Sequence, residues 1–268
     1  MKRVLTIASH KGGVGKTTTA LNLAYSLGRI VGQVLLVDLD PQSGLAHATN
    51  LRRRTSRGLI DFLKRQATAA EVRATTRDGV LTLVGTGEVA PADVGLLERA
   101  AVDGSLRAAV EELAEGFRYV VIDAPAGVGA VVRGILEGSD GTILVINCRA
   151  ITVRAIPTFL ALVQDVAGGA NPGLRLEGVL ISTFDARSSS EAGLLEEVRA
   201  TLPSDLLFRT VLPHDEAVEE ASLRSIPIAL HRGGEAMARL YLDLALELRE
   251  RELEMMQGRS DDEEPSLF

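Results

Sequence analysis

Cysteine is almost absent from this sequence. The chain of 268 residues contains one, Cys148, which excludes an internal disulfide and is too few for a cysteine-ligated metal site within one chain. No apolar run reaches the roughly 18 residues that a membrane-spanning helix requires. Met1 leads directly into a strand-like segment, VLTIAS, without the basic, apolar and small-residue pattern of a secretory signal. These absences predict a soluble protein of the cytoplasm.

An excess of basic charge is also lacking. The net charge is −7, so no global field attracts nucleic acid or anionic lipid, and binding of either would need a local basic patch. Residues 255–268 are acidic and polar, with DDEE before Pro265. We therefore expect one folded domain over residues 1–254, followed by a disordered tail.

Aliphatic segments alternate with segments of helical periodicity along most of the chain. This pattern predicts an α/β fold with a doubly wound, mostly parallel sheet that helices cover on both faces. Strands are expected at residues 4–8, 34–37, 81–84, 119–123, 142–146, 178–182 and 207–212. Helices are expected to begin at Thr17, Leu59, Ser105, Thr152, Ser190 and Glu235.

The segment KGGVGKT, between the first strand and the first helix, has the composition of a phosphate-binding loop. Its glycines let the backbone approach phosphates closely, and the amides at the helix N-terminus favour an anion. Lys16 would reach the β and γ phosphates, and the Thr17 hydroxyl would bind Mg²⁺. The residues expected to bind nucleotide here are Lys11, Gly12, Gly13, Val14, Gly15, Lys16, Thr17 and Thr18.

Carboxylates follow two of the expected strands. Asp38 and Asp40 end the aliphatic segment VLLVDLDPQSG, and Asp123 ends the apolar strand of FRYVVIDAPAGVG. Ligands of open α/β sheets lie at the carboxyl ends of the strands, so these side chains are candidates to face the nucleotide and its metal ion. The alternative interpretation of the first pair is a turn cap before Pro41.

Together these motifs resemble the ParA/MinD family of deviant Walker ATPases, whose signature is KGGxGKT. The resemblance extends to DxDPQ at Asp38–Gln42 and to DxPxG at Asp123, covers residues 1 to about 250, and is greatest with the chromosome-partitioning ParA branch. Ala126 is a feature more similar to the MinD branch. The resemblance implies ATP and Mg²⁺ as cofactors, with Lys11, Lys16 and Asp40 as catalytic residues and Thr17, Asp38 and Asp123 at the metal.

Individual roles also follow from the resemblance. Lys11 would reach across a homodimer interface to phosphates bound by the other subunit, and Asp40 would orient the attacking water. Hydrolysis would be slow and stimulated by a partner protein equivalent to ParB. Two further segments, GVLISTFDAR and TVLPHDEAVEEASLRSIPI, resemble the family's base pocket, and by that match Asp185, Pro213 and Asp215 would border the adenine. The alternative for Pro213 is a proline that simply opens a turn.

Members of the ParA branch bind nucleoid DNA without sequence preference through basic side chains, so the protein could be nucleoid-associated. Two basic positions of the family's loop are His214 and Ala217 here, which argues against DNA binding by that loop. A MinD-type membrane anchor is disfavoured by the acidic end of the chain. Candidate DNA contacts are Arg187, Arg199, Arg209, Arg224 and Arg232, and a second basic group is Arg52, Arg53, Arg54 and Arg57.

Other functions of the same scaffold require particular residues. An iron–sulfur reductase or cluster scaffold needs more than one cysteine. A tyrosine kinase relative would carry a tyrosine cluster at its end, and this chain has only Tyr25, Tyr119 and Tyr241. Two alternatives stay open: a MinD-like regulator of division-site, organelle or flagellum placement that does not use DNA, and a cofactor-biosynthesis ligase with strong intrinsic turnover.

Overall fold

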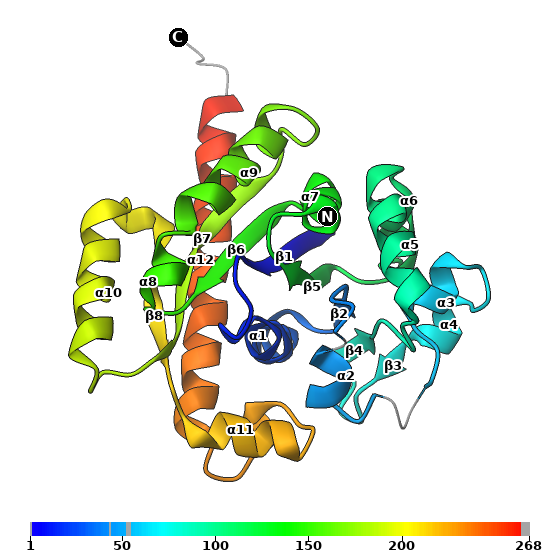
Figure 1. Ribbon diagram of the computed structural model, residues 1–268, viewed down its shortest axis with the longest axis horizontal. Coiled ribbons are helices and arrows are strands. Elements are labelled where there is room, and N and C mark those ends of the chain that lie inside the picture. Colours follow the sequence, from blue (N-terminus) through cyan, green and yellow to red (C-terminus); the bar gives the residue numbers. More distant parts are fainter. Residues whose placement is uncertain (1, 43, 52–54, 264–268) are drawn as a thin grey trace.

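The chain forms a single sheet of eight strands in the order β3-β4-β2-β5-β1-β6-β7-β8. The computed structural model describes residues 2–42, 44–51 and 55–263. All neighbouring strands are parallel except β3, which pairs antiparallel with β4. This architecture, shown in Figure 1, confirms the predicted α/β class. The strands are β1 (Arg3–Ser9), β2 (Val34–Asp38), β3 (Ala74–Thr75), β4 (Leu81–Val84), β5 (Tyr119–Ala126), β6 (Gly141–Ile146), β7 (Arg175–Phe184) and β8 (Leu207–Pro213).

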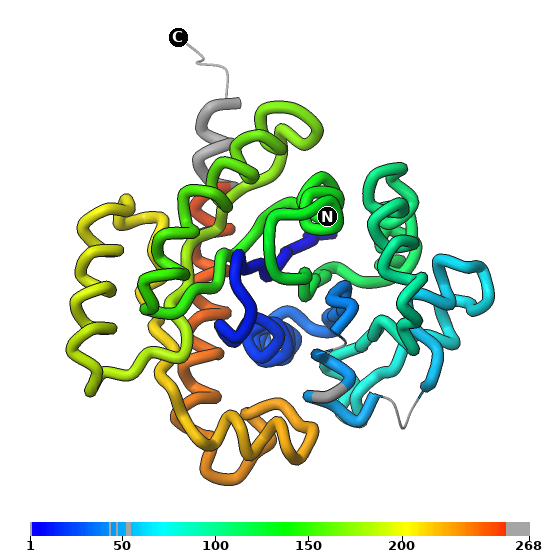
Figure 2. The backbone as a smooth tube through the Cα atoms, viewed as in Figure 1, coloured from blue at the N-terminus to red at the C-terminus, as the bar shows by residue number. Residues whose placement is uncertain are grey.

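Helices cover both faces of this sheet. They are α1 (Lys16–Val31), α2 (Gly44–Ala48), α3 (Leu59–Leu63), α4 (Ala69–Val72), α5 (Pro91–Val102), α6 (Ser105–Leu113), α7 (Ala130–Glu137), α8 (Ala150–Val153), α9 (Ile156–Gly168), α10 (Ser189–Thr201), α11 (Glu216–Leu223) and α12 (Glu235–Glu263). Two short 3-10 helices occupy Ser204–Leu206 and Ile228–Leu230. Figure 2 shows blue α1 near the centre of the view, with orange α11 below it and the cyan helices α3 and α4 at the right.

A separate hydrophobic core lies on each face of the sheet. Along β2, Leu35 and Val37 pack into the core that includes α5, α6, α7 and α9, whereas Val34 and Leu36 pack into the core that includes α1 and α12. Successive side chains of a strand point to opposite faces, and β2 is buried along its whole length. An uninterrupted aliphatic strand is therefore what a sheet with two covered faces requires.

The predicted strands are all present, but several helices differ from expectation. The first helix begins at Lys16, the helix expected from Thr152 is two helices, α8 and α9, and the one expected from Ser190 begins at Ser189. Helices α2, α4, α5, α7 and α11 were not predicted, nor was β3. Helix α12 continues to Glu263, so residues 255–263 are helical rather than disordered; residues 264–268 lie outside the described part of the chain.

One segment of the described residues has the length and composition of a membrane-spanning helix. Residues Ala150–Gly168 have a mean hydropathy of 1.4 and suffice for a span by length and composition alone. The structure divides this segment into α8 and α9 at Arg154 and Ala155. Phe159 and Val163 of α9 pack in the core beneath it, which accounts for part of the apolar character.

Candidate nucleotide-binding site

The three central strands bring the expected site residues to one edge of the sheet. Strand β5 lies between β1 and β2, and all three are parallel, so their carboxyl ends meet. Asp38 and Asp123 stand directly opposite each other in the register of β2 and β5. The loop of residues 10–15 leaves β1 at the same edge and leads into α1. Ligands of open α/β sheets bind at this position.

The loop has the backbone of a phosphate-binding loop. Gly13 and Gly15 have φ of +73° and +79°, in the left-handed region that favours glycine. A Cβ on Gly15 would also lie 2.8 Å from the Ser182 hydroxyl oxygen of β7. Gly15 is the N-cap of α1, and its carbonyl accepts the amide of Thr19 at 2.8 Å. The open amides of this helix start can therefore face an anion.

Lys16 lies among the three aspartates of the site. Its ammonium is 2.8 Å from an Asp123 carboxylate oxygen and 3.4 Å from one of Asp40, and only 7% of the side chain is exposed. Burial alone would lower the pKa of Lys16, but the charge of Asp123, followed by Asp40 and Asp38, raises it above its ordinary value. The lysine is therefore charged and is held by carboxylates at the place where phosphates would approach.

Asp38 is completely buried, and backbone amides hold its carboxylate. One oxygen accepts the amide of Asp40 at 2.9 Å, and the other accepts the amide of Leu45 at 3.1 Å. Burial and the neighbouring Asp123 raise the pKa of Asp38 to about 8, although these hydrogen bonds act in the opposite direction. Asp38 thus links the end of β2 to α2, and its surroundings supply too little positive charge to balance the carboxylate.

Asp123 has one oxygen on Lys16 and one, Oδ2, without a hydrogen-bond partner among the described residues, although the residue is fully buried. Burial raises the pKa of Asp123, while Lys16 and the hydroxyl of Thr17 oppose that shift. Buried polar atoms without partners are rare in native proteins and often mark a ligand site. The Thr17 hydroxyl acts on the same carboxyl group, and hard oxygen ligands of this kind suit Mg²⁺.

The described residues contain no group of three or more histidine, cysteine, aspartate or glutamate side chains arranged to hold a metal by themselves. Proteins usually bind Mg²⁺ through one or two carboxylates together with substrate phosphates and water. The carboxylates of Asp38, Asp40 and Asp123 share one ammonium here. The structure thus brings Thr17, Asp38 and Asp123 together at one strand end, and their role at a metal ion stays a prediction.

The segment after Asp40 packs against the start of α1. Asp40 accepts the amide of Gln42 at 3.0 Å, and a Cβ on Gly44 would lie 2.9 Å from the Thr17 hydroxyl oxygen. Ser43 is outside the described residues. The segment after Asp40 is therefore in close contact with the start of α1 at Thr17.

Lys11 differs from Lys16 in its surroundings. Its side chain is half-buried and has no ion pair or hydrogen bond among the described residues, whereas its carbonyl accepts the Ser9 hydroxyl at 2.9 Å. The backbone of Lys11 is thus fixed beside the phosphate loop while its ammonium remains available.

A cavity of about 240 Å³ opens beside the phosphate loop. Gly13, Gly15 and Thr18 line one side, and Pro213 and Asp215, from the end of β8 and the N-cap of α11, line another. Two of the three predicted base-pocket residues are therefore adjacent to the loop. Asp185 does not line the cavity, and its carboxylate binds Arg187 at 3.0 Å.

Other residues that line the same cavity were not predicted from the sequence. Ser182 and Thr183, at the end of β7, lie against the loop, and Tyr241 and Met237 of α12 line the far side. Thr183 has φ of +53°, unusual for a β-branched residue. The signal available in the sequence was a polar Ser-Thr pair at the end of an aliphatic strand.

Most of the predicted DNA-contact arginines are engaged by carboxylates. Arg187 pairs with Asp185 at 3.0 Å, Arg199 with Glu196 at 2.9 Å, and Arg209 with Glu247 at 3.7 Å and also with Glu250. Arg224 and Arg232 are exposed, with no ion pair or side-chain hydrogen bond in the part of the chain described. In the second basic group, Arg57 pairs with Glu71 at 3.6 Å, and Arg52, Arg53 and Arg54 lie outside the described residues.

The parallel sheet, the glycine loop at the start of α1 and the aspartates facing it define a P-loop nucleotide-binding protein. A family model described as an AAA domain matches residues 2–176. The chromosome-partitioning ATPase Soj of Thermus thermophilus is 32% identical over 249 residues, which cover 93% of this chain and 96% of that protein. The chain therefore belongs to the ParA/MinD family of deviant Walker P-loop ATPases, which use ATP and Mg²⁺.

Two solved structures share the fold. The cell division ATPase MinD of Pyrococcus furiosus has a TM-score of 0.74 at 24% identity, covering 93% of this chain and 99% of that chain. Cobyrinic acid a,c-diamide synthase of Mycobacterium smegmatis, with bound ADP and magnesium, has a TM-score of 0.71 at 25% identity, covering 91% of this chain and 93% of that chain. The first likeness shows the fold alone.

Proposed function

We propose that this protein is a ParA-type molecular switch that dimerises with ATP, positions or segregates a cargo in a bacterial cell, and releases it on hydrolysis. The observation that carries the proposal is the pair of lysines around the glycine loop: Lys16 is held by Asp123 and Asp40, while the Lys11 ammonium has no partner among the described residues. A free cation at the rim of a nucleotide site is suited to a second copy of that site. The relationship to a chromosome-partitioning ATPase supports the same function.

The residues divide the work of the ATP cycle. Lys16 would exchange its carboxylates for the β and γ phosphates, and the amides after Gly15 would bind the phosphate oxygens. Thr17 and Asp123 would hold Mg²⁺, with Asp38 in support, and the ion supplies positive charge to the phosphates. Asp40 would then be released from Lys16 and could orient the attacking water. Lys11 would reach the phosphates bound by the other subunit and so make dimer closure depend on the γ phosphate.

The chemistry in this scheme is positioning and electrostatic stabilisation, without a covalent intermediate. We infer slow hydrolysis in the isolated protein, because Asp40, once released from Lys16, would still be held in its own turn by the amide of Gln42. An activating partner, equivalent to ParB, would accelerate it. The cavity lined by Pro213 and Asp215 would receive the adenine, and the protein would act in the cytoplasm.

Nonspecific nucleoid DNA is the matrix that we favour for the ATP dimer. Among the candidate arginines, Arg224 and Arg232 have no ion pair within the described residues; Arg224 follows α11 directly, and Arg232 lies between the second 3-10 helix and α12. Arg187, Arg199 and Arg209 would first have to leave their carboxylates. Binding of this kind weakens steeply with salt in proportion to the number of phosphates neutralised.

A gel shift of nonspecific duplex DNA with ATP or ADP, across a salt series, tests this function. We expect a shift with ATP only, lost as salt rises. Arg224→Ala and Arg232→Ala should each weaken it and reduce the salt slope by about one, whereas the matched control Arg199→Ala, whose guanidinium is already paired, should change little. If ATP produces no shift even at low salt, DNA is excluded as the matrix, and a MinD-like switch that does not use DNA is favoured.

The fold shared with an ADP- and magnesium-bound diamide synthase keeps a second candidate, an ATP-dependent ligase of cofactor biosynthesis. A ligase of this kind would bind a small acid beside the ATP and would turn over rapidly without macromolecules. Phosphate release from the purified protein discriminates the two functions. If the protein is a switch, phosphate release should be slow and should rise when a protein partner is added. Fast phosphate release on addition of a small carboxylic acid would instead support the ligase.

A further inference from the structure

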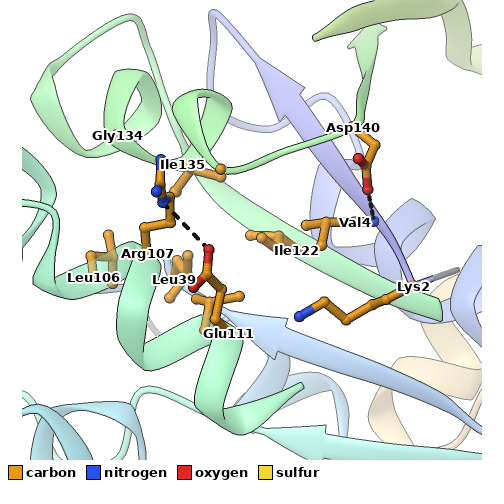
Figure 3. A pocket seen from close by; sticks show the side chains of 12 residues that line it. Lys2, Val4, Leu39, Leu106, Arg107, Glu111, Ile122, Gly134, Ile135 and Asp140 are labelled. Atoms are coloured by element: carbon orange, nitrogen blue, oxygen red, sulfur yellow. Dashed lines mark hydrogen bonds and ion pairs between the residues drawn. The ribbon is translucent and has the colours of Figure 1, made fainter. Parts of the chain in front are cut away.

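A second cavity, of about 270 Å³, lies on the sheet face that α6 and α7 cover. Figure 3 shows it between these helices and strands β1 and β5. Its walls are apolar and almost fully buried, with exposed fractions between 0% and 7%. The wall residues are Val4, Leu39, Leu106, Val110, Ile122 and Ile135.

Charged side chains surround the mouth of this cavity, and all but one are engaged. Asp140 accepts the backbone amide of Val4 at 2.7 Å, and Glu111 pairs with Arg107 at 3.4 Å. Lys2 has no ion pair or hydrogen bond to its side chain in the described part of the chain. Figure 3 shows the Lys2 side chain extending toward Glu111 and α6, across the mouth.

We propose that this cavity binds a small amphipathic monoanion, of the class of medium-chain carboxylates. Its volume exceeds that of an engineered apolar cavity of about 150 Å³ that binds benzene, and it is just below the usual range for small-molecule pockets. The apolar walls would receive the hydrocarbon part. The carboxylate would bind the ammonium of Lys2, the one charge at the mouth that lacks a partner within the described residues.

The cavity lies directly behind the carboxylates of the nucleotide site. Leu39 separates Asp38 from Asp40 in the chain, and its amide donates to the carbonyl of Asp123 at 2.9 Å. Ile122 immediately precedes Asp123. A ligand in contact with Leu39 and Ile122 therefore touches the backbone that positions these aspartates. The ligand site itself does not depend on the function proposed above.

Calorimetry with two matched probes, octanoate and the uncharged 1-octanol, tests the proposal on the nucleotide-free protein. We expect one octanoate per chain and weaker binding of octanol. Lys2→Gln should weaken octanoate roughly fivefold without affecting octanol, because it removes only the charge-assisted contact. Lys2→Arg should restore the preference. Val110→Phe, which fills the cavity, should abolish binding of both probes.

The exposed Arg77, in the β3–β4 turn, gives a charge control, and Arg77→Gln should bind both probes like the wild type. Lys2 is exposed, so its variants should fold even where Val110→Phe does not. Equal affinities for octanoate and octanol, or an unchanged octanoate affinity in Lys2→Gln, would overturn the proposal. Since no nucleotide or DNA is present, such a failure would leave the proposed switch function untouched.

Discussion

The two ends of the parallel strands form an amino-terminal and a carboxyl-terminal edge of the sheet, and carboxylates are buried at both. Only the amino-terminal edge provides enough cations to pair with them. At the amino-terminal edge, Arg3 contacts Glu177 at 2.7 Å and Glu252 at 2.5 Å, and Glu252 also binds Arg249 and the Tyr119 hydroxyl. At the carboxyl-terminal edge, three aspartates share Lys16. At the amino-terminal edge, paired charges connect α12 to β1, β5 and β7. At the carboxyl-terminal edge, carboxylates outnumber cations, which marks the place where a ligand would supply positive charge.

Burial raises the pKa of carboxyls at both edges, including Glu177 at the amino-terminal edge, but the cations differ. At the amino-terminal edge, burial alone would lower the pKa of Arg3, but Glu177 and Glu252 raise it, so the guanidinium stays charged. At the other edge, burial and Asp123 raise the pKa of Asp38 to about 8. The paired cluster at the amino-terminal edge connects α12 to the sheet, and the cluster with too few cations is the candidate binding site.

The largest expected effect is that of Lys16→Ala at the carboxyl-terminal edge. The substitution removes the one ammonium shared by the aspartates and the group expected to bind the transferred phosphate, so ATP hydrolysis should fall by about three orders of magnitude. Phosphate release measured at saturating partner protein checks this. Retained turnover would show that another cation performs the role.

Arg3→Met should break the paired cluster at the amino-terminal edge and change stability instead of turnover. It leaves Glu177 buried without its ion pair, while Glu252 keeps Arg249 and the Tyr119 hydroxyl. We expect this to cost about 3 kcal/mol in the free energy of unfolding. Urea denaturation measures the loss, and ATP turnover per folded molecule should be unchanged. The exposed Arg77→Met provides the control, with an expected change near zero.

Asp40→Ala should separate nucleotide binding from hydrolysis at the carboxyl-terminal edge. We expect ATP binding to persist, turnover to fall roughly a hundredfold, and the dimer to accumulate with ATP. Sizing chromatography after incubation with ATP detects the trapped dimer. Unchanged turnover would assign the water-orienting role to a different carboxylate.

The most gradual effect is the pH dependence of the nucleotide-free protein. Because the folded pKa of Asp38, about 8, is above its unfolded value, the folded state binds the extra proton between about pH 4 and pH 8. The contribution of Asp38 to stability is therefore present below pH 4 and is lost as the pH rises through 8. Asp38→Asn should flatten this part of the curve in denaturation measured from pH 5 to pH 9, and an equally steep fall in the variant would assign it to another group.

The sequence predicts one of the two edges far better than the other. The phosphate loop and the strand-end aspartates are recognisable because glycine spacing and aliphatic strands are local signals. The contact of Arg3 with Glu177 and Glu252 joins β1 to residues more than a hundred positions away, so no local pattern shows it.

The missed helices have local causes. Helix α7 follows a glycine-containing segment, residues 127–129, that reads as a loop, and α5 begins at Pro91 without a side-chain cap. One predicted base-pocket residue, Asp185, does not line the cavity and pairs with Arg187. That pairing depends on side-chain conformation at the end of β7, which composition and periodicity do not specify.

The central claim is that Lys11 converts a nucleotide site into a dimer contact, and Lys11→Ala tests it most directly. ATP affinity by calorimetry should stay near the wild-type value, because Lys16 and the loop amides remain. Sizing chromatography should then show a monomer with ATP, where the wild type and the control Arg77→Ala show a dimer. A normal ATP dimer of Lys11→Ala would contradict the account.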